Sequence, residues 1–352
     1  MLRLARIITS ILALLAVSPC CVAQDTWQAV AWSAPYDYSG VPQSVAIEPI
    51  AAAQQPWRLC AVYPHFKDAY WISVNYGMVE QAVTTGVRLK IVDAGGYPNI
   101  ERQGAQIKAC ARHSDALIVG PVSYDGLTPI ILEIAKRIPI IAAINDIAPE
   151  GITAKVGVPW TEMGRLIGAY LAKLHPPSAP RVELAWFPGP RGAGWASFVD
   201  SGFRAGLEGS SAHISLVKWG DTGFEIQSRL IDEALDESPT LNYIIGSAVT
   251  ADAAVSILRD RARDKGIAVL ADYFTHGTYR AIMRNRVLTA PTDSPVLQGR
   301  MIVDQAIRAL QGTLVYHHIG PPIVLVDKHN IGTIDLNHSL APATFSPRFQ
   351  VP

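Results

Sequence analysis

The chain has 352 residues, 30 basic and 30 acidic side chains, and 49% hydrophobic residues. This length suits two lobes of ordinary size better than one compact domain. The balanced charge excludes a nucleic-acid-binding surface, which needs a concentrated basic face, and no run of Lys or Arg is strong enough to bind anionic lipid.

Residues 1–23 have the pattern of a secretory signal peptide. The basic segment MLRLAR precedes the apolar run IITSILALLAVS, which is shorter than the roughly 20 residues needed to span a bilayer. Small residues at Cys21 and Ala23 fit cleavage before Gln24, and a retained signal anchor is the alternative. A lipid-modified cysteine is disfavoured by the residues that precede it. The sequence therefore predicts a soluble exported protein without stable membrane insertion.

Cleavage at this point would leave Cys60 and Cys110 as the cysteines of the mature chain. Two cysteines in an oxidising compartment can pair. Cys60 lies in the first predicted strand of the regular region and Cys110 near the end of its second predicted helix, which are neighbouring elements in a wound sheet. A disulfide and two buried thiols that pack as small hydrophobes both remain open.

Residues 24–56 carry turn and breaker residues without a sustained period, which predicts an extended N-terminal arm. From Trp57 onward, strand-like runs alternate with amphipathic helices. The first series of strands is RLCAVY, RLKIVDAGG, ALIVGPV and PIIAAIND. The second series is AKVGVPW, RVELAWFPGP, ISLVKWGD, YIIGSAV and IAVLADYF. Continuous apolar strands separated by helices indicate an α/β fold with two doubly wound parallel-sheet lobes.

Aromatic residues gather where these strands end. The segment YPHFKDAYW follows the first strand, Tyr97 follows the second, Trp160 opens the helix after a middle strand, and Tyr273 ends a late one. Ligands of open parallel sheets bind beyond the carboxyl ends of the strands. Each of these rings is therefore either a wall of a binding cleft or a part of the core.

Signs of enzymatic chemistry are weak, because the sequence has no P-loop, no HExxH and no zinc-type cluster of Cys and His. The loop GPRGAG matches a dinucleotide-binding turn poorly. His65 and His276 fit hydrogen-bonded or solvated histidines better than cleft residues. Asp146 and Asp293 end strands and could form an acid–base pair, orient a ligand as acceptors, or cap helices. We expect no enzymatic activity, no metal and no cofactor.

Several segments resemble the TorT family of type I periplasmic binding proteins. They are LCAVYPHFKDAYWISVNYGM, AGGYPNIERQGAQI, VGVPWTEMG, GPPIVLV and SLAPATFSPRF. The resemblance covers roughly residues 57–350 and does not extend to the arm at 24–56. It implies a protein of the periplasm that binds trimethylamine N-oxide and reports it to the periplasmic sensor domain of a TorS-like histidine kinase.

The resemblance also implies two lobes that close around the ligand by a hinge of three strands. The expected crossings lie near residues 147–152, 272–276 and 313–318. The expected N-terminal lobe comprises residues 57–147 and 275–315. The expected C-terminal lobe comprises residues 150–272 and 316–352.

Trimethylamine N-oxide carries three methyl groups on a formally positive nitrogen and one negative oxygen. Aromatic faces attract such a cation by about 0.5–2 kcal/mol each, and the oxygen accepts hydrogen bonds from ring N–H or O–H groups, backbone amides or water. The expected cage consists of Trp71, Tyr97, Trp160 and Tyr273, with Asp68 and Tyr70 beside it. The expected ligand-binding set also includes Asp146 and Asp293.

Two segments depart from the family pattern. Trp195 in GPRGAGWASF is bulky where a small residue is expected, and VSYDGLTP is this chain's own. The ligand could therefore be another methylated amine, such as a betaine or a choline-like compound. The rival interpretations are a solute-binding protein of an ABC importer, for a sugar or a methylated amine, and an exported α/β enzyme. The strand ends carry few polar groups, which disfavours a sugar.

Overall fold

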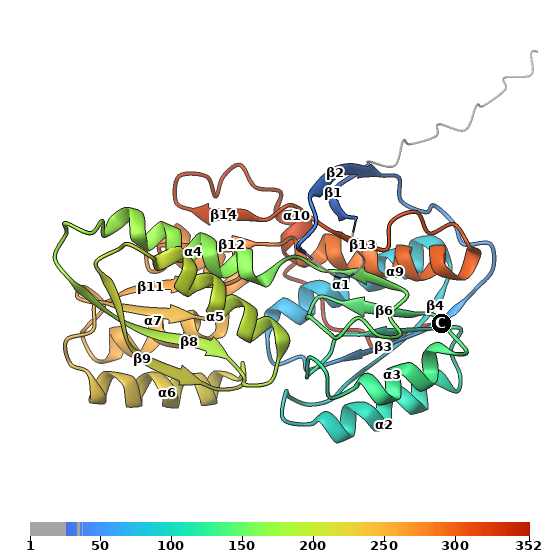
Figure 1. Cartoon of the computed structure of the whole chain (residues 1–352), viewed down its shortest axis with the longest axis horizontal. Coiled ribbons are helices and arrows are strands. Elements are labelled where there is room, and N and C mark those ends of the chain that lie inside the picture. Colours follow the sequence, from blue (N-terminus) through green and yellow to red (C-terminus); the bar gives the residue numbers. More distant parts are fainter. Residues whose placement is uncertain (1–25, 34–35, 37) are drawn as a thin grey trace, which may run out of the picture.

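A nine-stranded sheet forms the first lobe, at the right in Figure 1. The structure, a computed structural model, describes residues 26–33, 36 and 38–352, so the predicted signal peptide at 1–23 lies outside the described residues. The strand order is β15-β4-β3-β5-β6-β7-β13-β1-β2. The strands are β1 (Trp27–Trp32), β2 (Pro42–Ile47), β3 (Arg58–Tyr63), β4 (Arg88–Asp93), β5 (Ala116–Val119), β6 (Ile140–Ala143), β7 (Ala154–Val156), β13 (His318–Gly320) and β15 (Gln350–Val351).

Helices cover both faces of this sheet, and the alternation within β3 shows why its sequence is continuously apolar. Leu59, Ala61 and Tyr63 pack in one core cluster with α1 and α9, whereas Cys60 and Val62 pack in another with α2 and α3. A strand buried on both faces has no polar side to display. The helices are α1 (Ala69–Thr85), α2 (Ile100–Ala111), α3 (Thr128–Ala135) and α9 (Pro295–Gln311).

The second lobe contains a parallel four-stranded sheet in the order β11-β10-β8-β9 and an antiparallel pair, β12 and β14. Its strands are β8 (Val182–Gly189), β9 (Ala212–Trp219), β10 (Tyr243–Gly246), β11 (Ala268–Ala271), β12 (Thr289–Thr292) and β14 (Val324–Asp327). Its helices are α4 (Trp160–Leu174), α5 (Gly194–Leu207), α6 (Phe224–Glu237), α7 (Ala248–Asp260), α8 (His276–Met283) and the short α10 (Leu336–Ser339). The predicted two-lobed α/β fold is thus present.

The boundaries between the lobes differ from the expected ones. Strand β7 pairs with β6 and β13, so the chain leaves the first sheet at 157–159, after β7 rather than before it. It returns at 293–294, after β12, crosses again at 321–323 to reach β14, and comes back to the first sheet once more at β15, so the chain passes between the lobes four times rather than the expected three. Strands β13 and β15 therefore belong to the first lobe, while α8 and β12 belong to the second. Sequence periodicity finds strands but does not tell which sheet each one joins.

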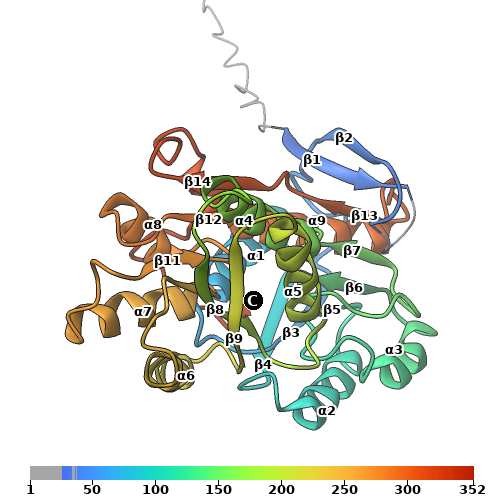
Figure 2. The same cartoon turned by 60° about the vertical axis from the view of Figure 1, so that its left-hand side comes forward.

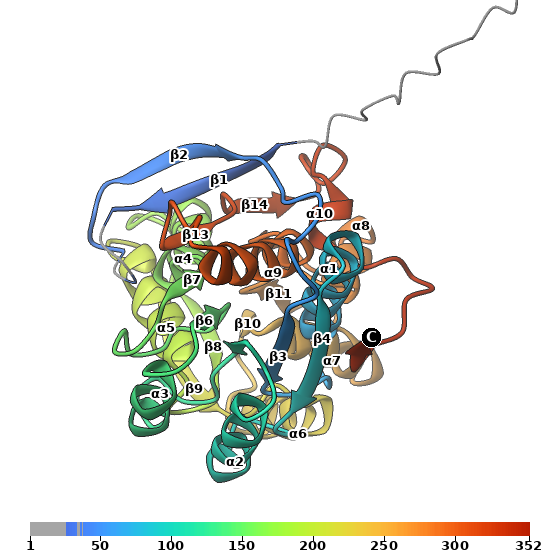
Figure 3. The same ribbon diagram turned by 90° about the vertical axis from the view of Figure 1, so that its right-hand side faces the viewer.

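The expected N-terminal arm is part of the first sheet. Strands β1 and β2 form an antiparallel pair, and β1 pairs in turn with β13 (Figure 3). The prediction of an extended arm was wrong because the segment shows no sustained period, and because β13, the strand that joins this pair to the sheet, lies near the other end of the chain.

A disulfide joins Cys60 of β3 to Cys110 of α2. Both residues are buried in the cluster between the sheet and its α2–α3 layer. The sequence left open whether these cysteines form a disulfide or remain two buried thiols, and the structure contains the disulfide.

Helices α4 and α5 lie side by side (Figure 2) because glycines let their backbones approach. A Cβ atom on Gly202 would lie 1.9 Å from the carbonyl oxygen of Thr161, and one on Gly164 would lie 2.1 Å from that of Val199. Gly202→Ala should lower the free energy of unfolding by about 2–3 kcal/mol through overpacking. Gly266→Ala is the control, since its Cβ would meet only Arg263 O at 3.9 Å. Equal urea midpoints for the two variants would contradict the packing argument.

Candidate ligand-binding site

A small cavity lies between the lobes, at the carboxyl ends of strands from both sheets. The first lobe contributes Asp68, Tyr70, Trp71, Tyr97 and Asn145, and the second contributes Trp160, Trp195, Thr222 and Tyr273. The cavity between these walls is small, with a volume of about 10 Å³, far below the about 300–1,000 Å³ typical of pockets for drug-sized ligands. In this closed arrangement the walls of the cavity therefore nearly meet.

The first-lobe side chains are positioned by strand ends and by the start of α1. Asp68 is the N-cap of that helix, and its Oδ1 accepts a hydrogen bond from the backbone N–H of Tyr70 at 2.9 Å. This cap satisfies one of the free donors of the first turn and places the next two aromatic residues at the cavity. Tyr97 follows β4, and Asn145 follows β6.

The second-lobe side chains come from helix starts and strand ends as well. Trp160 is the first residue of α4, and Trp195 is the second residue of α5. Thr222 follows β9, and Tyr273 follows β11. The cavity is therefore assembled only when both lobes are present and closed.

The rings face one another across the cavity at distances typical of edge-to-face aromatic pairs. The Tyr70 and Tyr273 centroids are 5.3 Å apart at 72°, and those of Trp160 and Trp195 are 5.3 Å apart at 50°. Trp160 also lies within 6.4 Å of Tyr70 and 6.3 Å of Tyr273. It is thus a central ring of the set, and its own exposed fraction is 3%.

Most polar atoms of the cavity wall have partners within the protein. Tyr273 donates its hydroxyl to Asp68 Oδ2 at 2.5 Å. Trp160 Nε1 donates to the carbonyl oxygen of Ile144 at 3.2 Å. Asn145 Nδ2 donates to the Tyr97 hydroxyl at 3.0 Å. These bonds fix the orientation of the rings before any ligand arrives.

Asp68 is the carboxylate of the cavity wall. Burial raises its pKa, while the hydrogen bonds from Tyr273 and from the backbone of Tyr70, together with nearby His65, oppose that rise. These donors hold negative charge beside the rings. Such an arrangement favours a ligand with a positive, poorly hydrated centre.

Two contacts hold the lobes together at the edge of the cavity. The bond between Tyr273 and Asp68 joins the second lobe to the first. His65 Nε2 lies 3.0 Å from Thr222 Oγ1 and 3.5 Å from Asp221 Oδ1, which are both in the second lobe. The structure is therefore in a closed arrangement.

The two remaining predicted site residues do not line this cavity. Asp146 pairs with the ammonium of Lys155 on β7, and both side chains are buried. Asp293 Oδ2 accepts from the hydroxyl of Tyr70 at 2.6 Å and from Gln298 Nε2 at 2.7 Å, so it lies behind the cage wall. Each carboxylate binds groups of the protein through one of its oxygens and lies outside the aromatic cavity, so a role in ligand contact or as an acid–base pair stays a prediction.

Asp293 should give the protein a measurable dependence of stability on pH. Burial raises its pKa to about 6, so the folded state favours the protonated acid. Its contribution to stability is present below about pH 4 and is lost as pH rises through about 6, up to about 3 kcal/mol. We expect Asp293→Asn to reduce the fall in unfolding free energy between pH 4.5 and 7, measured by urea titration. An unchanged pH dependence would contradict this assignment.

Comparison with known proteins now decides the family. A family model described as periplasmic binding proteins and sugar binding domain of the LacI family matches residues 56–345. The chain belongs to this family. Within it the chain is TorT-like: the periplasmic protein TorT of Escherichia coli (strain K12) is 37% identical over 296 residues, which is 84% of this chain and 85% of that protein. The predicted resemblance and the predicted fold class are thereby confirmed.

Solved structures of other periplasmic binding proteins superpose over most of the chain. A solute-binding protein of an ABC transporter from Bradyrhizobium sp. BTAi1, with bound bis-tris, is 42% identical, covers 92% of this chain and 98% of its own, and has a TM-score of 0.77. TorT in complex with the TorS sensor domain in the presence of trimethylamine N-oxide is 35% identical, covers 83% and 99%, and has a TM-score of 0.74. Members of this family bind solutes and are not enzymes.

Sequence reasoning missed three residues of this binding protein's cavity. Asn145 directly precedes Asp146, which was predicted as a site residue in its place. Thr222 follows a strand that has no aromatic residue after Trp219. Trp195 was noted as a departure from the family but was not placed in the cage. Its position in the second residue of a helix after a strand is the signal that would have found it, because Trp160 occupies a similar place.

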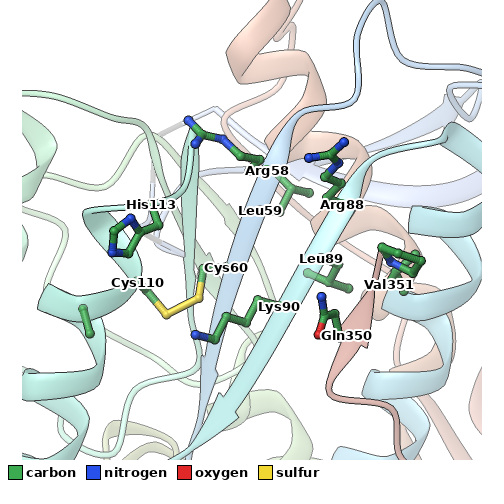
Figure 4. Close-up of a pocket in the computed structure, with 12 residues that line it drawn as sticks. Arg58, Leu59, Cys60, Arg88, Leu89, Lys90, Cys110, His113, Gln350 and Val351 are labelled. Carbon is green, nitrogen blue, oxygen red and sulfur yellow. A yellow bond between two sulfur atoms is a disulfide. The ribbon is translucent and has the colours of Figure 1, made fainter.

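A second pocket of this binding protein lies at the amino end of the first-lobe strands, around the disulfide (Figure 4). Its charged wall consists of Arg58, Arg88, Lys90 and His113. It lies away from the carboxyl strand ends, where α/β sheets bind ligands. The aromatic cavity, by contrast, lies at those ends.

The described part of the binding protein contains no helix that is long and apolar enough to cross a membrane. Within residues 26–33, 36 and 38–352, no group of three or more His, Cys, Asp or Glu side chains is arranged to hold a metal ion.

Proposed function

We propose that this periplasmic binding protein captures trimethylamine N-oxide or a closely related methylated amine in its aromatic cavity. The observation that carries the proposal is a closed box of six buried rings with one carboxylate. The rings are Tyr70, Trp71, Tyr97, Trp160, Trp195 and Tyr273. Ring faces attract a methylated cation that cannot donate hydrogen bonds, and the carboxylate adds negative charge beside them.

We further propose that the protein works in the periplasm after cleavage of the signal peptide, and that it signals through the sensor domain of a TorS-like histidine kinase. The support comes from its TorT relative, which is periplasmic and whose complexes with the TorS sensor domain were solved both without ligand and with trimethylamine N-oxide. The ligand would act by favouring the closed arrangement of the lobes, since a ligand shifts an equilibrium toward the state that it binds better.

A second candidate function is solute capture for an ABC importer. It is favoured by the 42% identity to the Bradyrhizobium solute-binding protein, which holds bis-tris, an amine that carries several hydroxyl groups. The two functions share a cavity and differ in the partner that binds the closed form of the protein, which is a sensor kinase in one case and an ABC permease in the other.

The ligand proposal is tested by thermal unfolding with four compounds: trimethylamine N-oxide, trimethylamine, glycine betaine and ribose. A ligand present at 100 times its Kd stabilises the folded state by about 2.7 kcal/mol. We expect stabilisation by the N-oxide and none by ribose. Stabilisation by ribose alone would replace the methylated-amine proposal with a sugar-binding function.

The partner is tested separately, by gel filtration of the protein with the purified sensor domain of a histidine kinase encoded beside it. Co-elution that depends on trimethylamine N-oxide or is modulated by it supports signalling. Ligand binding without any complex, together with ligand uptake that requires a neighbouring permease gene, would favour the importer.

A further inference from the structure

The indole N–H of Trp195 is a buried donor without an acceptor. The side chain lines the cavity and is 2% exposed, and its Nε1 makes no hydrogen bond within the part of the chain that the structure describes. Its neighbours differ: the Trp160 N–H is bound to Ile144, and the hydroxyls of Tyr70 and Tyr273 are bound to aspartates. A buried donor left unpaired costs stability, so its position indicates an acceptor on the ligand.

A second donor lies beside it. The Tyr97 and Trp195 ring centroids are 6.1 Å apart. The Tyr97 hydroxyl accepts a hydrogen bond from Asn145 Nδ2, so it presents its own hydrogen as a donor. Burial raises the pKa of Tyr97, and interactions of its hydroxyl with Asn145 and with the Trp195 N–H oppose that rise. The Trp195 N–H thus lies near the Tyr97 oxygen without reaching hydrogen-bond geometry. This corner of the cavity therefore offers two hydrogen-bond donors to one acceptor atom.

The backbone holds the Trp195 ring in place. Gly189, at the end of β8, has a positive φ of +111°, and a Cβ atom there would lie 2.5 Å from the Trp195 ring. A Cβ atom on Gly194 would lie 3.0 Å from the carbonyl oxygen of Asp146. Gly189 therefore leaves the space that the indole fills, and Gly194 lets the start of α5, which carries the indole, pack closely against the backbone of Asp146.

We propose that Trp195 Nε1–H, with the Tyr97 hydroxyl beside it, is the specificity-determining donor that binds the oxygen of an amine N-oxide. This inference rests on the proposed function. The ring faces bind methyl groups and a positive nitrogen, and they do so equally for a quaternary ammonium of the same shape. The two donors, Trp195 Nε1–H and the Tyr97 hydroxyl, add binding energy only for a ligand with an anionic oxygen on the nitrogen. They therefore select N-oxides over quaternary amines.

The test compares trimethylamine N-oxide with tetramethylammonium, in which a fourth methyl group replaces the oxygen. Calorimetric titration of Trp195→Phe, which keeps a ring but loses the N–H, should show a Kd for the N-oxide raised about tenfold to a hundredfold, as for the loss of a bond to a charged acceptor. The Kd for tetramethylammonium should change less than about threefold. Tyr97→Phe should show the same selectivity with a smaller effect, which keeps the test available if Trp195→Phe does not fold.

Trp160→Phe is the matched control, because it also removes an indole N–H, but one already bound to Ile144. It should change both affinities by the same factor. A wild-type protein that binds neither compound would overturn the proposed function itself. Wild-type binding of the N-oxide with an unchanged ratio of the two affinities in both Trp195→Phe and Tyr97→Phe would overturn this inference and leave the function standing.

Discussion

Replacement of Trp160 by Ala is expected to raise the Kd for trimethylamine N-oxide about a hundredfold. Trp160 lies against Tyr70, Trp195 and Tyr273, so its removal opens the cage on three sides. The loss combines a desolvated cation–π contact of about 2 kcal/mol with aromatic packing of about 1 kcal/mol. A total of about 3 kcal/mol corresponds to about a hundredfold in affinity.

Calorimetry at 25 °C measures this effect, with Trp219→Ala as the control. Trp219 is a Trp of the same lobe that packs against Arg191 and does not line the cavity. We expect Trp219→Ala to bind the N-oxide with an affinity within about threefold of wild type. Equal affinities for Trp160→Ala and wild type would remove Trp160 from the cage.

The second large effect is expected for Asp68→Asn, which should raise the Kd about thirtyfold. Asn is as good an N-cap as Asp, so α1 keeps its start, while the negative charge that faces the methylated nitrogen is lost. Two unit charges about 4 Å apart attract by about 4 kcal/mol at an effective dielectric of about 20, and desolvation and repulsion from the ligand's own negative oxygen offset part of this. A net loss of about 2 kcal/mol gives the expected change.

The pH dependence isolates the charge of Asp68. Because its pKa is raised by burial, acidification neutralises it before an exposed aspartate, and the affinity for a permanent cation should fall with pH. Tetramethylammonium does not titrate, so its Kd should rise as the pH is lowered for wild type and stay constant for Asp68→Asn. Asp335→Asn, which also replaces an N-cap Asp, at α10, is the matched control. A wild-type Kd for tetramethylammonium that does not change with pH would contradict the electrostatic role of Asp68.

Much of the cavity was predictable because it depends on local order along the chain. Trp71, Tyr97, Trp160 and Tyr273 were selected since each stands just beyond a predicted strand, and the carboxyl ends of parallel strands meet at one edge of a sheet. The structure brings all four to one cavity. The direction of each side chain did not have to be known for this prediction.

The aspartates show where such reasoning fails. Asp68, Asp146 and Asp293 all stand near strand ends, but Lys155 neutralises the second and Tyr70 and Gln298 bind the third. Those partners come from other strands and helices, up to 223 residues away in the sequence. No spacing in the sequence indicates which carboxylate will form an ion pair or hydrogen bonds with a neighbouring side chain and which will face a ligand.

The sequence by itself determined the order of strands and helices from β3 to β11, the two-lobed class and the aromatic character of the site, because hydrophobic periodicity and strand-end position are properties of short segments. Only the tertiary structure decided the lobe boundaries, the pairing of β1 with β13, and the place of Trp195 in the cage. Each of these depends on contacts between segments far apart in the chain, whose free energies are set by packing and burial in the folded molecule and are not encoded in any local pattern.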